Sequence, residues 1–208
     1  MNMKEWGSDH FSIRCLLALC CLLIFIPLEA KAFLITNGDF ELGSLAGWRV
    51  FETPNGSLGG EGFPRCVDVD VTGDGRMSKS AVFKVGQHEY QAGRPSLAGG
   101  GIYTTVQLDK GRLVLTADIA SSYFSPSDRR NLAGGLFELL VDGEVVASHD
   151  FGPIPTATTQ YERLEGTVDI SAGMHEVRIR IQRPFRSLSH DQAPQQYLDN
   201  IQINLFPH

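Results

Sequence analysis

NGDFELGSLAGW, residues 37–48, is the stretch from which the fold of this chain follows. Its Asn, Asp and Gly residues favour turns, because they tolerate backbone conformations that other residues avoid. Phe40 and Trp48 are large aromatic residues of the kind that fill a sandwich interior. The stretch predicts the first turn and strands of an all-β domain, and YLDNIQI, residues 197–203, is predicted to be the strand that closes it.

The N-terminus has the features of a secretory signal peptide. Residues 1–14 are polar with basic side chains, residues 15–28 form an unbroken apolar run, and Ala30-Lys31-Ala32 supplies small residues for signal peptidase. The apolar run is shorter than the roughly 18 residues that a membrane-spanning helix needs. We therefore expect cleavage after Ala32, export to the periplasm or the extracellular space, no stable membrane anchor, and one mature domain over residues 33–208.

Charge and cysteine content restrict what the mature domain can do. Residues 1–32 carry equal numbers of acidic and basic side chains, so the net charge of −6 belongs to the mature domain. This charge argues against nucleic-acid binding, which takes its affinity from basic side chains. Cys66 is the one cysteine left after cleavage, so an internal disulfide is excluded. We expect Cys66 to be a small buried residue on a strand.

The mature chain consists of short runs of β-branched and aromatic residues, separated by Gly, Pro, Asn and Asp. Residues 67–71 alternate Val with Asp, and residues 175–182 alternate apolar residues with Arg and Gln, as in strands with one buried face. Asp142-Gly143 predicts a two-residue hairpin turn. We predict a jelly-roll β-sandwich of two antiparallel sheets. The predicted strands are residues 33–36, 47–52, 66–71, 80–85, 102–108, 112–120, 136–141, 145–150, 160–168, 175–183 and 196–205.

Two predicted loops, residues 121–135 and 184–195, are longer than a turn requires. Long loops in a compact sandwich are either functional or mobile. Because a guanidinium binds carboxylates and sulfates with two hydrogen bonds, the arginines of these loops could recognise acidic glycans; the alternative is that they are solvated surface residues. These arginines are Arg129, Arg130, Arg183 and Arg186.

The order of several short motifs carries a resemblance to a known group of proteins. NGDFE, then GW, then GGGIYTTVQLDKGRLVLTADIA at residues 99–120, and finally YLDNIQI resemble the carbohydrate-binding modules with a galactose-binding-domain-like jelly roll, of the xylan- and glucan-binding type. The resemblance covers residues 33–205. The chain departs from the family pattern where Arg112 follows the turn glycine in place of Tyr, and in having only Trp48 as a mature-domain tryptophan.

The resemblance implies a structural calcium ion that joins the two ends of the domain. Its ligands would be Glu41, main-chain carbonyls and carboxylates around Asp39, and Asp199 of the last strand. Carboxylates and carbonyls at a turn are suitable ligands, because calcium binds six to eight oxygen atoms. The alternative is that Asp39 and Glu41 only shape a turn. The acidic run DVDVTGDG, residues 68–75, resembles a calcium loop superficially, but its flanks are strands and its twelfth position is Lys79.

Sugar binding requires aromatic side chains that stack on sugar rings, with polar neighbours that bind hydroxyl groups. The candidates are Tyr103 with Gln107 on one strand, Tyr123, Phe124 and Arg129 in the first long loop, Tyr161, and Phe185 in the second loop. Each aromatic has the alternative role of a core or edge residue.

Three functions remain open on this scaffold. We expect a secreted, non-catalytic module that binds a polysaccharide or glycan through the long loops or a concave sheet face. The alternatives are an extracellular protein-interaction or matrix protein, and a jelly-roll polysaccharide lyase or glycoside hydrolase. No nucleophile, zinc or phosphate-binding motif is present, and Ser189-His190-Asp191 is contiguous, unlike a catalytic triad. A pair of catalytic carboxylates stays open, because the sequence does not give their separation.

Overall fold

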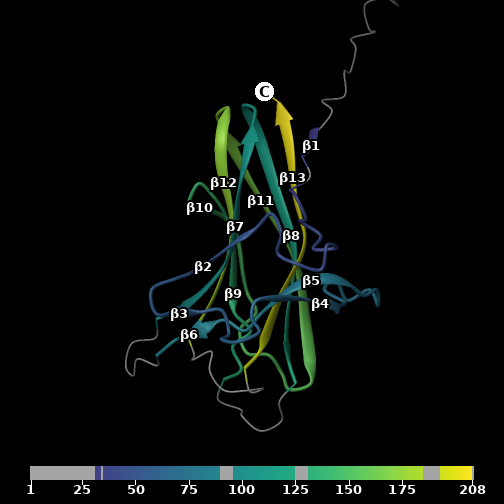
Figure 1. The fold of residues 1–208 in the computed structure, drawn as a ribbon, viewed down its shortest axis with the longest axis vertical. Helices are drawn as coiled ribbons and strands as arrows, with labels where there is room; N and C mark the ends of the chain where they lie inside the picture. Colours follow the sequence, from purple (N-terminus) through teal and green to yellow (C-terminus); the bar gives the residue numbers. More distant parts are fainter. Residues whose placement is uncertain (1–30, 34, 90–95, 125–130, 185–192, 208) are drawn as a thin grey trace, which may run out of the picture.

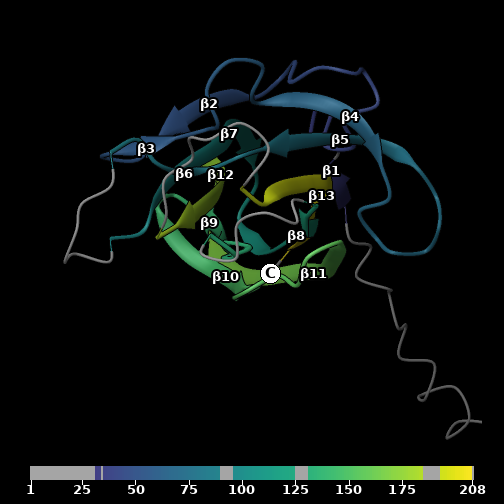
Figure 2. The same cartoon turned by 90° about the horizontal axis from the view of Figure 1, so that it is seen from below.

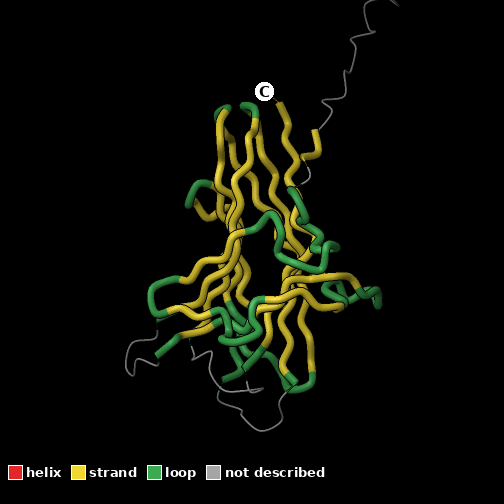
Figure 3. The backbone as a smooth tube through the Cα atoms, in the orientation of Figure 1, coloured by secondary structure: helices red, strands yellow, loops and turns green. Residues whose placement is uncertain are grey.

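The computed structural model consists of strands and loops (Figures 1 and 3), and the part of the chain that it describes is residues 31–33, 35–89, 96–124, 131–184 and 193–207. One sheet has the strand order β11-β8-β13-β5-β4, with β1 also paired to β13, and is called sheet A here. Sheet B has the order β10-β9-β12-β7-β2. A two-stranded ribbon joins β3 to β6. Every strand pair is antiparallel, so the predicted all-β fold of two antiparallel sheets is confirmed.

The strand bounds follow the sequence pattern closely. All eleven predicted strands overlap strands of the structure, the first only at Phe33, whereas β3 and β6 were missed. The strands are β1 (Lys31–Phe33), β2 (Arg49–Glu52), β3 (Gly56–Ser57), β4 (Arg65–Val69), β5 (Ser78–Phe83), β6 (Gly86–Gln87), β7 (Ala98–Leu108), β8 (Gly111–Tyr123), β9 (Leu136–Val141), β10 (Glu144–Asp150), β11 (Thr158–Ile170), β12 (Gly173–Arg183) and β13 (Gln195–Pro207).

The β9–β10 hairpin has the turn that its sequence predicts. Asp142 and Gly143 have φ values of 50° and 85°. A type I′ turn requires positive φ at both central residues, and Asp and Gly accept that conformation at low cost.

The main core lies between the two sheets. Val177, Ile179 and Ile181 of β12 are completely buried in it, while the residues between them face outward, as the alternation predicts. Phe40 and Trp48 also lie in this core, with their ring centroids 6.2 Å apart, so their predicted role is confirmed. Cys66 is half-buried against the same core, and burial raises the pKa of its thiol.

Sheet A carries a second, smaller apolar cluster on its outer face. Val71, Val82, Ala120 and Tyr197 are buried there, and Val67 packs against them from β4. Val82, Tyr197 and Ala120 are register neighbours on β5, β13 and β8. Because Val71 belongs to the β4–β5 loop, this loop bends over the outer face of its own sheet. Figure 2 shows the loop bending toward β11.

The opening turn meets the last strand at a bulge in β13. β13 pairs with β5 as far as Leu198, and on the same edge it pairs with β1 from Ile203 onward. Between these points the opening turn takes the place of a strand: the Ile201 amide donates to the carbonyl of Gly38 at 2.9 Å, and the Lys79 amide of β5 donates to Glu41 Oε1 at 3.0 Å. The predicted contact between the NGDFE turn and the YLDNIQI strand is confirmed.

The predicted signal peptide, residues 1–30, lies outside the described residues, while β1 includes Lys31 and Ala32 at the predicted cleavage site. Among the described residues no helix is long and apolar enough to span a membrane.

Candidate ligand-binding surfaces

The predicted aromatic residues do not share one surface. Tyr103 follows the buried Ile102 on β7 and faces outward from sheet B. Tyr161 pairs with Ala120 and faces outward from sheet A. Phe124 is 64% exposed directly after β8. Tyr123 is 1% exposed in the main core, so its prediction as a sugar-stacking residue is wrong, because the inward alternation of β8 extends to the end of the strand.

The outer face of sheet B brings aromatic and cationic side chains into neighbouring positions. Tyr103 is the register partner of Arg49 on β2 and of Arg178 on β12. Phe51 lies two residues along β2 from Arg49, opposite Gly101. We call Arg49, Phe51, Tyr103 and Arg178 the Tyr103 surface. Its residues come from three adjacent strands, so the hydrogen-bond ladder fixes their relative positions.

Arg178 fixes one side of the aromatic pair. Its guanidinium carbon lies 4.4 Å from the Phe51 ring centroid and 5.3 Å from the Tyr103 centroid, a cation–π arrangement. The two rings meet edge to face with centroids 6.2 Å apart. Arg178 also pairs with Glu176 at 2.8 Å, while its buried Nε has no hydrogen-bond partner among the described residues. These contacts hold the Tyr103 ring in one orientation.

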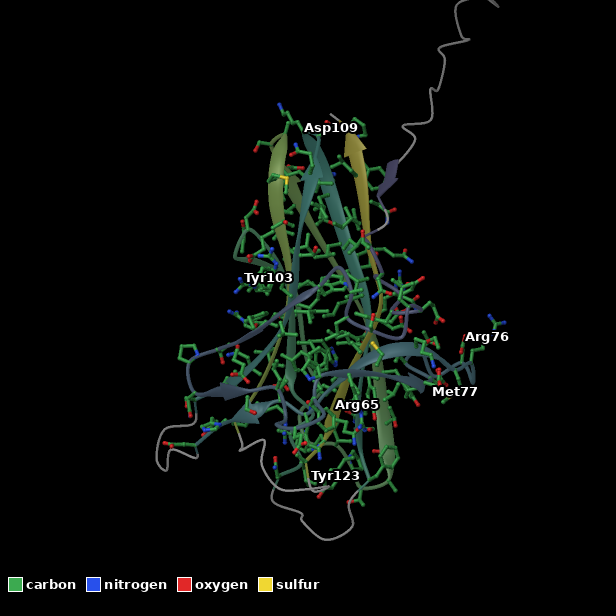
Figure 4. The ribbon with its side chains drawn as sticks, in the orientation of Figure 1. Arg65, Arg76, Met77, Tyr103, Asp109 and Tyr123 are labelled. Carbon is green, nitrogen blue, oxygen red and sulfur yellow. The ribbon has the colours of Figure 1, made fainter. Side chains whose placement is uncertain are left out.

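A pocket of about 230 Å³ opens beside Tyr103, lined by Gly47, Arg49, Tyr103, Thr104 and Thr105. No residue of β12 lines it, so it lies on the β2 side of the ring, away from Arg178. A fixed ring beside an arginine and Thr105, which is on the same face of β7, provides one apolar surface and several hydrogen-bonding groups. Figure 4 shows Tyr103 midway along the long strands. Gln107, the predicted partner of Tyr103, is exposed on the same face of β7, four residues along the strand.

A larger cleft of about 330 Å³ lies on the opposite sheet. It is formed by two residues of the β4–β5 loop, one residue of β8 and three of β11, and we call it the Tyr161 cleft. These residues are Val71, Thr72, Asp118, Tyr161, Glu162 and Arg163. Tyr161 is 41% exposed. Figure 4 shows Arg76 and Met77, at the tip of the same loop, on the opposite side of the molecule from Tyr103.

The two carboxylates near this cleft are in different environments. Asp118 pairs with Arg163 at 2.7 Å and lines the cleft. Asp199, its register neighbour on β13, is 1% exposed and accepts hydrogen bonds from Ser78 at 2.5 Å and Ser80 at 3.1 Å. Burial raises the pKa of Asp199 against the opposing effect of these hydrogen bonds, and repulsion from Asp118 adds to the increase. Only Asp118 of the two can meet a ligand in the cleft.

The predicted calcium ligands are close together in the fold but are engaged by protein donors. Glu41 accepts from the Lys79 amide, Asp39 accepts from the Glu41 amide at 3.4 Å, and Asp199 accepts from the Asn200 amide and from the two β5 serines. No group of three Asp, Glu, His or Cys residues suited to a metal occurs within the described ranges. Calcium stays a prediction from the sequence resemblance.

The acidic run at residues 68–75 is a turn built around one carboxylate. Asp70 accepts hydrogen bonds from the amides of Gly73 at 2.6 Å and Gly75 at 2.8 Å. The pKa of Asp70 is lowered because these amide hydrogen bonds outweigh the opposing effect of desolvation.

The loop arginines do not form a basic surface that the structure describes. Arg129, Arg130 and Arg186 lie outside the described residues, as does Phe185. Arg183 is completely buried, which contradicts its predicted role in recognising acidic glycans. Its guanidinium instead donates to the carbonyl oxygens of Ala133 and Val85.

Sequence reasoning missed most of the polar residues of both surfaces. The sequence does not indicate that Arg49, Phe51 and Arg178 lie around Tyr103. Their proximity depends on the strand order β2-β7-β12. The pairing of Asp118 with Arg163 depends in the same way on the β8–β11 register. The alternation of Arg178 and Arg180 on the polar face of β12 was the one available signal.

No protein-family model and no curated protein sequence matches this chain. Among solved structures, the chain is similar to a family 61 carbohydrate-binding module in complex with β-1,4-galactotriose, with 12% identity and a TM-score of 0.48 over 83% of this chain and 97% of that chain. It is also similar to the xylan-binding domain CBM22-1 from Paenibacillus barcinonensis, with 12% identity and a TM-score of 0.43 over 87% of this chain and 95% of that chain. A Stig cyclase from Fischerella sp. TAU has 17% identity and a TM-score of 0.44 over 86% of this chain and 99% of that chain. The carbohydrate-binding modules among these structures are of the kind that the motifs resemble.

Proposed function

We propose that this protein is an exported, non-catalytic carbohydrate-binding protein and that the Tyr103 surface holds the glycan. The observation that carries the proposal is the Tyr103 ring, fixed by Arg178 on one side and facing a pocket of about 230 Å³ on the other. Sugar rings have apolar faces and polar edges. A rigid aromatic ring with hydrogen-bonding groups beside it matches both parts of such a ligand.

Arg49 gives this surface its charge preference. Arg178 is paired with Glu176, and Arg180 on the same face is paired with Glu138 at 2.5 Å. Within the described residues Arg49 forms no ion pair, so the surface keeps one cation that can donate to sugar hydroxyls or to a uronic-acid carboxylate. We expect neutral and carboxylated polysaccharides to bind here, with the carboxylated ones sensitive to salt.

The experiment is affinity electrophoresis of the purified protein through gels that contain xylan, β-1,4-galactan, mixed-linkage β-glucan or polygalacturonate. At least one polysaccharide is expected to retard the wild-type protein and to retard Tyr103→Ala much less. Phe124→Ala is the matched control, because it removes an exposed aromatic ring outside the Tyr103 surface. Migration unaffected by every polysaccharide would reject carbohydrate binding at this surface.

Catalysis by a carboxylate pair is the main alternative. Glycoside hydrolysis requires two carboxyl groups that flank the bound glycosidic linkage. Asp199, the register neighbour of Asp118, is 1% exposed and lines neither pocket. Glu162 lies beside Asp118 in the lining of the Tyr161 cleft, but its carboxylate is on the other face of β11, 4.0 Å from His149 of β10. We therefore expect no increase in reducing ends, and no unsaturated product absorbing at the lyase wavelength, when the protein is incubated with a polysaccharide that it binds.

A further inference from the structure

The Tyr161 cleft has walls that the fold holds in place. Val71, which is 1% exposed, anchors the β4–β5 loop on the outer apolar cluster of sheet A, and the Asp70 carboxylate fixes the turn that follows. Gly73 in this turn has a φ of +76°, and a Cβ atom built there would lie 3.0 Å from the Tyr161 ring. The loop therefore reaches the ring itself and limits the length of any ligand that enters the cleft.

The polar groups of the cleft are also fixed before any ligand arrives. The Asp118 side chain is 8% exposed and accepts from Arg163 at 2.7 Å and from Asn200 at 2.8 Å. Arg163 also donates to the Thr116 hydroxyl at 3.2 Å, although half of its side chain is exposed. An arginine held in this way can present its remaining N–H groups to a ligand without losing further side-chain entropy.

The charges of the cleft indicate which ligands it accepts. Asp118 and Arg163 line it with opposite charges, while the Glu162 carboxylate lies on the other face of β11, 4.0 Å from His149 of β10, so the cleft has no net positive charge that would attract an anionic ligand. The Tyr161 ring is 41% exposed and offers an apolar surface beside these groups. The volume of about 330 Å³ is at the lower end of the range of about 300–1,000 Å³ found for small-molecule sites.

We propose that the Tyr161 cleft is a second saccharide-binding site, which takes the end of a neutral glycan chain. One sugar ring stacks on Tyr161, and its hydroxyl groups bind Arg163 and Asp118. The cleft faces outward from sheet A and the Tyr103 surface faces outward from sheet B, so the two sites lie on opposite faces of the sandwich. One chain can then bind two glycan segments at once and link neighbouring polysaccharide chains, which a protein with one site cannot do.

The test is a titration of the isotope-labelled protein, followed by amide NMR shifts, with β-1,4-galactotriose, xylohexaose and trigalacturonate as probes. A neutral probe is expected to shift the amides of Thr72, Tyr161 and Arg163, and trigalacturonate is expected not to shift them. Tyr161→Ala should weaken this binding about tenfold or more through loss of the stacking surface. Tyr161→Phe keeps the ring and should bind within about twofold of the wild-type protein.

Matched variants distinguish binding at the Tyr161 cleft from binding at the Tyr103 surface. Tyr103→Ala should leave the shifts at Thr72 and Arg163 unchanged, so failure of the Tyr103 surface and failure of the cleft are distinguishable. Gly73→Val is a second variant for the cleft: its side chain contacts the Tyr161 ring at a φ that disfavours Val, so it should weaken cleft binding while the Tyr103 amides respond as before. The proposal is wrong if neither neutral probe shifts the cleft amides, or if Tyr161→Ala binds as tightly as the wild-type protein.

Discussion

At the scale of single residues, Asn37 determines the shape of the opening turn. Its side-chain amide donates to the carbonyl oxygens of Ser44 at 2.8 Å and Ala46 at 3.0 Å, and its side-chain oxygen accepts from the Leu42 amide at 3.2 Å. Its own carbonyl accepts from the Trp48 indole at 3.1 Å. One asparagine therefore organises the turn that places Glu41 and Trp48.

Asn37→Ala is expected to lower the free energy of unfolding by about 2–3 kcal/mol, since each of the three lost hydrogen bonds contributes about 1 kcal/mol. Urea denaturation measures the change. Asn37 has a φ of 56°, which disfavours Ala, so Asn37→Gly is the control that removes the hydrogen bonds without this strain. Wild-type stability in both variants would contradict the role of the side chain.

His175 and Asp142 form a hydrogen-bonded pair that should make the stability of the protein depend on pH. The imidazole Nδ1 lies 2.6 Å from Asp142 Oδ2, and Nε2 lies 2.8 Å from the Ser171 carbonyl. Burial disfavours the charged imidazole, but these hydrogen bonds outweigh it and raise the pKa of His175. For Asp142, desolvation is opposed by the hydrogen bonds from His175 and the Glu176 amide, which lower the pKa.

The pair should therefore stabilise the protein most between about pH 4 and pH 6.5, the ordinary values for the two groups. The contribution of His175 is complete below about pH 6.5 and is lost as pH rises through its raised pKa, and that of Asp142 is lost as pH falls through its lowered pKa. His175→Gln should remove the loss of stability above about pH 6.5 in urea denaturation. His149→Gln is the control, and an unchanged pH profile in His175→Gln would count against the assignment.

At the scale of elements, Arg183 joins the end of β12 to two segments that precede β9 and β6. It donates to the carbonyl of Ala133 at 2.5 Å, to that of Val85 at 2.9 Å, and to the side chain of Asn131. Complete burial lowers the pKa of Arg183 to about 9, so the guanidinium remains protonated at neutral pH and keeps its hydrogen bonds.

Arg183→Met should destabilise the protein by roughly 3 kcal/mol, because it leaves the buried Val85 carbonyl and the partly buried Ala133 carbonyl without these donors. Arg112→Met is the matched control: Arg112 is exposed and 3.4 Å from the exposed Asp169, so its loss should change stability by about 0.5 kcal/mol or less. Equal effects of the two substitutions in urea denaturation would contradict the structural role of Arg183.

The β4–β5 hairpin shows which properties of a strand the sequence could predict and which it could not. The alternation of Val and Asp correctly predicted that Val67, Val69 and Val71 share one face of the chain. It could not predict that this face would be the outer face of sheet A, because the cover is provided by the same hairpin's own loop. For the candidate site, Tyr103 and Tyr161 were recognised as aromatic residues, but their placement on opposite sheets follows from strand pairing, which a single sequence does not give.

At the scale of the whole molecule, direct hydrogen bonds join the opening turn to the last strand at the β13 bulge and to β5. The predicted calcium ion would act at the same place, where Glu41 and Asp199 both approach β5. If the ion is bound, thermal unfolding with added calcium should occur at a higher temperature than unfolding with EDTA, because a ligand of the native state stabilises it. A midpoint that is the same under both conditions would reject the calcium prediction.

The two outer faces of the sandwich differ in ways that matter for binding. Sheet B presents a ring fixed by Arg178 beside the cationic Arg49, whereas sheet A presents an exposed ring in a cleft where Arg163 is paired with Asp118. The central claim is that the first of these faces binds glycan through Tyr103.

The most direct test is isothermal titration of the wild-type protein, Tyr103→Ala and Phe124→Ala with the polysaccharide that most retards the wild-type protein in affinity gels. Tyr103→Ala should bind about tenfold more weakly, and Phe124→Ala should bind within about twofold of the wild-type protein. Thermal unfolding at the wild-type temperature shows that each variant is folded. Wild-type affinity in Tyr103→Ala would contradict the account.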